Sequence, residues 1–142
     1  MTSQGSYCLC MKVERELALD VGALGRITFP RGAYVYVGSA MNGLDARLRR
    51  HLNTSMGSYR AVHWHIDYLL RAEGVSIESI FVQESDTKTE CAIAAAVSER
   101  GVPVRGFGCS DCRCFSHLFR VEGCESLIGL GLNRRPPSEY LA

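Results

Sequence analysis

A strand of aromatic and β-branched residues that runs into an arginine-rich helix is the feature that most constrains the fold. Residues 34–39 read Tyr34-Val35-Tyr36-Val37-Gly38-Ser39, a composition typical of a strand. Leucine then recurs at every fourth position from Leu44 to Leu52, which predicts an amphipathic helix. The same spacing predicts that Arg47, Arg50 and His51 fall on the other faces of this helix.

The rest of the chain adds further strands and helices. Alternating or β-branched runs predict strands at 7–13, 26–29, 75–83 and 116–121. Helices are expected at 65–73 and 89–100, each followed by a glycine, and residues 124–132 form a last helix or turn. Pro136-Pro137 is expected to end the regular structure. This order predicts one α+β domain over residues 1–142, with a small, mainly antiparallel sheet flanked by helices.

Composition and charge exclude several classes of protein. Apolar residues make up 46% of the chain and charged residues 22%, as in ordinary globular domains. No apolar run reaches the ~20 residues of a membrane span, and residues 1–5 do not resemble a signal peptide. We therefore expect a cytoplasmic protein with no membrane partner. A net charge of +1 argues against a histone-like binder, but a local basic face is enough to bind nucleic acid.

The seven cysteines are expected to be free thiols, because the chain is large and shows no export signal. Cys8 and Cys10 share one face of the first strand and are interpreted as core residues or a surface pair. Four soft metal ligands lie close together in the sequence: Cys109, Cys112, Cys114 and His117. They could bind zinc, but such a crowded segment closes a tetrahedron with difficulty, so we favour packed thiols.

A tyrosine-rich strand end next to an arginine-rich helix suits a phosphodiester. Arginine binds phosphate bidentately and stabilises developing negative charge. Tyrosine can orient or deprotonate a water if neighbouring cations lower its pKa. The alternative is an aromatic core strand followed by a solvated basic helix.

At these positions the sequence resembles the GIY-YIG endonuclease superfamily. Tyr36-Val37-Gly38-Ser39-Ala40 is similar to the second half of its motif, and Arg47-Leu48-Arg49-Arg50-His51 resembles its arginine- and histidine-bearing helix. Gly5-Ser6-Tyr7 stands where the first half-motif is expected, with Ser6 in place of isoleucine. Residues 19–32 are an insertion that lengthens the intervening hairpin. Residues 63–68 and 110–118 extend the likeness to the Uri-type branch of poorly characterised archaeal and bacterial proteins.

The resemblance implies an endonuclease that hydrolyses DNA phosphodiester bonds with one Mg²⁺ or Mn²⁺ ion, in DNA repair. The alternative is a catalytically inactive nucleic-acid-binding or recruitment module. In the first case Tyr7 is the general base or the residue that positions water, and Tyr36 lines the same pocket. Arg47 stabilises the phosphate, and His51 binds phosphate or relays a proton.

The same resemblance implies a glutamate as the metal ligand. Glu90, at the start of the helix over 89–100, is our choice, with Glu99 in reserve. A purely structural interpretation of Glu90 is an acid favoured by the helix dipole. His63 and His65 lie two positions apart, so they converge only if that stretch is extended; otherwise they form local hydrogen bonds. The full set of expected substrate-binding residues is Gly38, Ser39, Arg50, His63, His65, Asp111 and His117.

Overall fold

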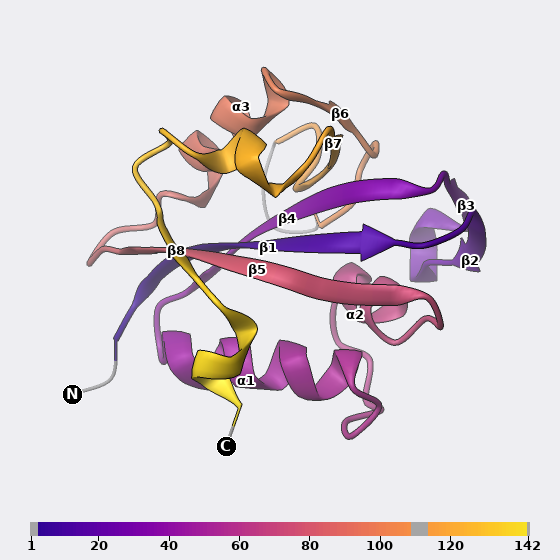
Figure 1. The fold of residues 1–142 in the computed structure, drawn as a ribbon, viewed down its shortest axis with the longest axis horizontal. Coiled ribbons are helices and arrows are strands. Elements are labelled where there is room, and N and C mark those ends of the chain that lie inside the picture. The colour runs from indigo at the N-terminus through magenta and orange to yellow at the C-terminus, as the bar shows by residue number, and fades with distance from the viewer. Residues whose placement is uncertain (1–2, 109–113, 142) are drawn as a thin grey trace.

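Strand β1 lies at the centre of a six-stranded antiparallel sheet in the order β6-β7-β4-β1-β5-β8. The computed structural model describes residues 3–108 and 114–141, and Figure 1 shows how its helices lie on both sides of the sheet. The sheet strands are β1 (Gly5–Val13), β4 (Gly32–Ala40), β5 (Val75–Glu84), β6 (Gly101–Pro103), β7 (Leu118–Val121) and β8 (Asn133–Arg135). The helices are α1 (Leu44–Ser55), α2 (His65–Leu70) and α3 (Glu90–Ser98). The predicted α+β class with an antiparallel sheet is confirmed.

Both faces of β1 are buried, so the strand joins two hydrophobic cores. Successive side chains of a strand point to opposite faces. Tyr7, Leu9 and Met11 accordingly belong to the core under α1 and α2, whereas Cys8 and Cys10 belong to the core on the α3 side. The predicted strand is therefore a central one, and its side chains cannot move independently of either core.

Helix α1 packs more of its residues against the sheet than its leucine spacing suggests. Leu44, Leu48 and Leu52 are buried as expected, but His51 is also fully buried. The prediction that His51 lies on another face is wrong for a geometric reason. Residues 44, 48 and 51 fall within one narrow stripe of a helix that turns 3.6 residues at a time.

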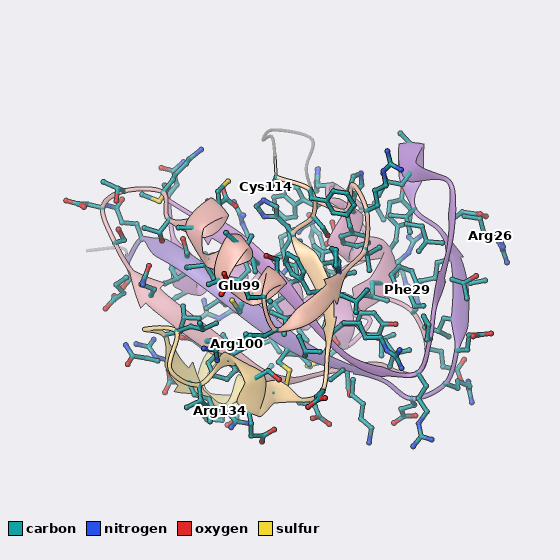
Figure 2. All side chains as sticks on the ribbon, turned by 90° about the horizontal axis from the view of Figure 1, so that it is seen from above. Arg26, Phe29, Glu99, Arg100, Cys114 and Arg134 are labelled. Atoms are coloured by element: carbon teal, nitrogen blue, oxygen red, sulfur yellow. A yellow bond between two sulfur atoms is a disulfide. The ribbon has the colours of Figure 1, made fainter. Side chains whose placement is uncertain are left out.

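Short elements account for most of the differences from the predicted strands and helices. Strand β3 (Arg26–Phe29) was expected, but its partner β2 (Leu17–Asp20) was not. Figure 2 shows Arg26 of this hairpin reaching outward while Phe29 points inward. Strands β6 and β8 were also missed. Three 3₁₀ helices complete the described chain: η1 (Gly22–Leu24), η2 (Cys124–Leu127) and η3 (Pro137–Tyr140).

The C-terminal residues continue the regular structure past Pro136-Pro137, contrary to the prediction. Helix η3 begins at Pro137, and its Tyr140 is only 3% exposed. The Arg49 Nε of α1 donates to the Tyr140 carbonyl at 3.3 Å. Among the described helices, none combines the length and the apolar character that crossing a membrane requires.

A disulfide joins Cys10 of β1 to Cys124 of η2, across 114 residues of sequence. The Cα atoms are 5.8 Å apart, within the range that disulfides adopt. The expectation of free thiols is therefore wrong for this pair. Cys10 shares its face with Cys8, as expected, but its covalent partner comes from the other end of the chain.

Candidate functional site

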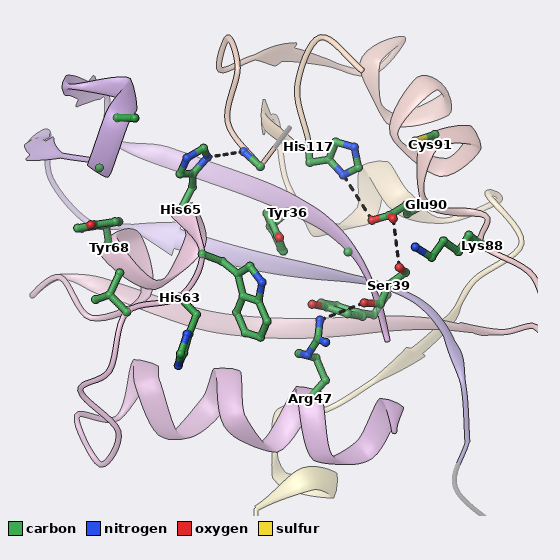
Figure 3. Close-up of a pocket in the computed structure, with 17 residues that line it drawn as sticks. Tyr36, Ser39, Arg47, His63, His65, Tyr68, Lys88, Glu90, Cys91 and His117 are labelled. Carbon is green, nitrogen blue, oxygen red and sulfur yellow. Dashed lines mark hydrogen bonds and ion pairs between the residues drawn. The ribbon is translucent and has the colours of Figure 1, made fainter. Parts of the chain in front are cut away.

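A pocket of about 630 Å³ opens where the end of β4 meets the first turn of α3 and the entry to α2. Figure 3 shows side chains from several elements pointing into it. Tyrosines from β1 and β4 form the floor of the pocket, and an arginine from α1 lies on one side. Polar groups from α3 and from the segment just before β7 lie on the other side. Its lining includes Tyr7, Tyr36, Gly38, Ser39, Arg47, His63, Trp64, His65, Lys88, Glu90, Cys91, Gly108 and His117.

Gly38 makes room for the Tyr7 ring. The two residues are paired across β1 and β4, and a Cβ added at Gly38 would lie 2.6 Å from both the Cζ and the hydroxyl oxygen of Tyr7. Any larger residue at this position must displace the ring, since real Cβ atoms do not approach so closely. Gly38 therefore sets the position of the Tyr7 ring in the pocket.

The Tyr7 hydroxyl lies 2.7 Å from His51 Nε2, and the Arg47 guanidinium is near enough to act on the pKa of Tyr7. His51 Nδ1 is buried without a hydrogen-bond partner among the described residues. A lone pair is less costly to leave unpaired than an N–H. We therefore assign the proton of His51 to Nε2, which donates to Tyr7. In this arrangement the Tyr7 oxygen accepts from His51, and neither His51 Nε2 nor Arg47 can accept the Tyr7 O–H, since both carry only donors there.

Burial makes both Tyr7 and His51 neutral. It raises the pKa of Tyr7 to about 12, against a smaller opposing effect of the Arg47 charge. It also lowers the pKa of His51 to about 3, with the charges of Arg47 and Arg50 adding to the decrease. The pKa of Tyr36 is likewise raised by burial. A tyrosine was expected to deprotonate a water only if neighbouring cations lowered its pKa. In this pocket the pKa values of Tyr7 and Tyr36 are raised instead. Contact of His51 with phosphate does not fit its full burial behind Tyr7.

Arg47 is fixed at the pocket wall by two contacts. Its NH1 donates to the Ser39 carbonyl at 3.0 Å, and its guanidinium lies over the Trp64 ring, 4.4 Å from the centroid. The Ser39 hydroxyl in turn donates to Glu90 Oε1 at 3.1 Å. Ser39, near the end of β4, thus binds both Arg47 and Glu90.

Arg50, predicted to bind substrate, is not among the residues that line the pocket. Its guanidinium donates to both oxygens of Asp67, at 3.4 and 3.2 Å, and lies over Trp64 at 4.2 Å. Asp67 is fully buried and also accepts from the backbone N–H groups of His63 and Trp64. Arg50 therefore holds the entry to α2 in place, and its effect on the pocket passes through Trp64. The sequence signal for Asp67 was its place in the first turn of α2, where acids accept backbone N–H groups.

Glu90 begins α3 and faces the pocket, while Glu99 lies at the other end of the helix. Glu90 Oε2 is 3.8 Å from His117 Nδ1, and the side chain is 24% exposed. Thr89, which precedes α3, makes no side-chain capping hydrogen bond to the helix; its hydroxyl bonds to Ser6 and to Gln83 Oε1, each at 2.8 Å. These bonds link the start of α3 to β1 and β5, and so fix the carboxylate relative to the sheet.

The histidines before and within α2 both line the pocket. His65 Nδ1 accepts from the Gly108 N–H at 2.8 Å, so the proton of the neutral ring is on Nε2. Burial lowers the pKa of His65. His63 precedes α2 and His65 is its first residue, so the stretch is not continuously extended as convergence was expected to require, and Figure 3 shows the two rings pointing in different directions.

Cys91, Cys114 and His117 lie close enough to hold a metal ion, with one ligand atom of each within 4.8 Å of the others. Cys114 and His117 belong to the predicted cysteine cluster, but Cys91 was not considered because it is far away in the sequence. Cys109, Cys112 and Asp111 lie outside the described residues. Trp64 and Lys88 are further pocket residues that sequence reasoning did not assign to the site.

The fold and the pocket define a small α+β domain with a polar cavity between sheet and helices. The chain belongs to the family described as domain of unknown function DUF123, whose model matches residues 6–130. No curated protein and no solved structure matches the chain.

Proposed function

We propose that this chain is a metal-dependent endonuclease of the GIY-YIG type that hydrolyses DNA phosphodiester bonds. The observation that carries the proposal is the convergence of a hydroxyl, a guanidinium and a carboxylate on one pocket. They come from Tyr7 of β1, Arg47 of α1 and Glu90 of α3. The pairing of Tyr7 with Gly38 supports it too, because it sets the two half-motifs side by side on adjacent strands.

Arg47 binds the scissile phosphate. Its fixed position over Trp64 leaves the planar guanidinium little freedom, and a pre-positioned donor stabilises the charge that develops on the phosphoryl oxygens. Lys88, which also lines the pocket, adds a second positive charge. A basic pocket in a chain of net charge +1 favours local phosphate binding over general adhesion to DNA.

Glu90 fits a single Mg²⁺ or Mn²⁺ ion. One of its oxygens is anchored by Ser39, and the side chain remains partly open to the pocket. Magnesium is commonly held by one or two carboxylates together with waters and substrate phosphate. A bound ion would polarise the phosphate and lower the pKa of a coordinated water.

Tyr7 orients the attacking water. Tyr7 is protonated at neutral pH because its pKa is raised, so it is not available as a general base before the reaction. Of the two roles implied by the resemblance, we therefore choose positioning of the water. His51 fixes its oxygen, and its O–H remains to hold the water. His51 and the nearby Arg47 charge would also stabilise negative charge on the oxygen if the proton leaves during the reaction.

The test is cleavage of flap, nicked, bubble and single-stranded DNA by the purified chain with Mg²⁺ or Mn²⁺. Glu90→Gln should abolish cleavage and keep salt-sensitive DNA binding. Glu99→Gln is the matched control, since it changes the same residue type at the far end of α3, and it should cut normally. Binding without cleavage by the unmodified chain would instead support the inactive recruitment module.

A further inference from the structure

A second cluster at the rim of the pocket has the chemistry of a soft-metal site. Cys91 is the second residue of α3, and Cys114 and His117 lie just before β7. Their ligand atoms lie within 4.8 Å of one another. Zinc bound at its usual ~2.0–2.3 Å distances places such atoms roughly 3.3–3.8 Å apart. Small side-chain rotations therefore suffice to bring all three onto one ion.

The hydrogen bond of His117 sets the tautomer that a metal requires. His117 Nδ1 lies 3.0 Å from the Val37 carbonyl oxygen. A carbonyl can only accept, so Nδ1 must carry the proton and Nε2 the lone pair. Metal-binding histidines characteristically donate their other N–H to a carbonyl or carboxylate in this way. Glu90, at 3.8 Å, adds a carboxylate on the same side of the ring.

We propose that Cys91, Cys114 and His117 bind a zinc ion. Two thiolates and a neutral imidazole are soft or borderline ligands, which select zinc over magnesium. Glu90 offers only hard oxygen, so the two sites differ in ligand chemistry although they are neighbours. Three protein ligands fill three of the four tetrahedral positions of zinc.

The zinc site would tie the first turn of α3 to the segment before β7, two parts of the chain that are far apart in sequence. Cys91 follows Glu90 directly, and His117 contacts it. Zinc on the His117 ring would add positive charge close to Glu90, whose Oε2 lies 3.8 Å from Nδ1, and this charge would hold the carboxylate more firmly. Only this positioning role depends on the proposed nuclease function; zinc binding does not.

The test is zinc content and affinity of the full chain, purified under reducing conditions. We expect about one zinc ion per chain, and a Co²⁺-substituted protein with thiolate-to-metal absorption bands. Loss of a residue that only hydrogen-bonds to a metal ligand lowers metal affinity roughly 10- to 100-fold. Cys91→Ser removes a ligand itself, so it should lower zinc affinity by at least that much. Cys91 is exposed, so this variant should fold. Cys8→Ala, which removes a thiol from the α3-side core, should keep its zinc.

Three results would overturn the proposal. They are a chain that binds no zinc, zinc binding that survives both Cys91→Ser and Cys114→Ser, and a Cys91–Cys114 disulfide in the reduced preparation. DNA cleavage separates this proposal from the previous one. A chain that binds zinc at these residues but cuts no DNA supports the zinc site and counts against the nuclease. Cleavage by a chain that binds no zinc supports the nuclease and counts against the zinc site.

Discussion

The ring of Tyr7 lies against the Cα of Gly38, its partner across β1 and β4, with no space for a side chain between them. Gly38→Ala should therefore displace the Tyr7 hydroxyl from His51 and Arg47. We expect DNA cleavage to fall by at least about tenfold, since misplacement of a reacting group by about 1 Å can cost about 100-fold. Cleavage rates under single-turnover conditions measure this, and circular dichroism checks the fold. The backbone conformation of Gly38 is an ordinary one, so wild-type cleavage by a folded Gly38→Ala protein would contradict the role of Tyr7.

Tyr7→Phe removes the hydroxyl and keeps the ring. We expect cleavage to fall by about 10²- to 10⁴-fold, the usual range for a positioned proton-transfer group, while DNA affinity stays close to that of the unmodified chain. Titration of labelled DNA measures the affinity separately from the rate. Tyr59→Phe is the control, because Tyr59 lies on the surface under Arg50 and outside the pocket. Equal losses in the two variants would exclude a specific role for the Tyr7 hydroxyl.

Asp67→Ala should destabilise the fold. It leaves the Arg50 charge and the N–H groups of His63 and Trp64 without their acceptor. Breaking a buried ion pair costs about 3–5 kcal/mol, and we expect a loss of about 3 kcal/mol in urea unfolding. Asp45→Ala changes an exposed acid in the first turn of α1 and should cost well under about 1 kcal/mol. A similar small loss for Asp67→Ala would show that Asp67 does not organise the entry to α2.

Acid should destabilise the protein through His51. Its pKa is about 3 in the folded state and about 6.5 when unfolded, so between these values the unfolded chain binds the additional proton. Stability therefore rises with pH across this window. From pH 7 to pH 5 the loss due to His51 is about 2 kcal/mol by the same linkage. Urea unfolding at both pH values should show a shallower pH dependence of stability for His51→Gln than for the unmodified chain. Identical slopes would show that His51 is solvated.

Loss of the Cys10–Cys124 disulfide should lower the free energy of unfolding by about 4–5 kcal/mol, because the bond closes a loop of more than 100 residues in the unfolded chain. Cys10→Ala, Cys124→Ala and the double variant should be similarly destabilised, since each breaks the same bond. Thiol counting under denaturing conditions verifies the bond itself. Additive losses in the double variant would mean that the two cysteines act separately.

The larger elements could be predicted because each has its own local signal. The alternation in β1 and β4 and the leucine spacing of α1 depend only on neighbouring residues. Strands β2, β6 and β8 have at most four residues each. Such short segments become strands only because a neighbouring strand pairs with them, and that depends on tertiary structure.

The residues of the candidate site that belong to a sequence motif could be predicted. Those that meet only because distant segments pack together could not. Tyr7, Tyr36, Arg47 and Glu90 were expected to share a pocket, and all four line it. Burial decides the rest: it makes His51 a neutral partner of Tyr7 instead of a phosphate ligand. Cys91 joins Cys114 and His117 only through the packing of α3, which no local pattern in the sequence encodes.

Strand β1 is hydrogen-bonded on both edges, buried on both faces and covalently linked at Cys10. Tyr7, three residues before that link, therefore shares the rigidity of the whole sheet. If the chain cleaves DNA as we propose, adjustment to different DNA shapes should come from the wall of the pocket that includes His63 and Trp64, where residues 56–64 run without a helix or strand. Variation in that segment should alter which DNA is chosen, whereas variation around Tyr7 should alter whether any DNA is cut.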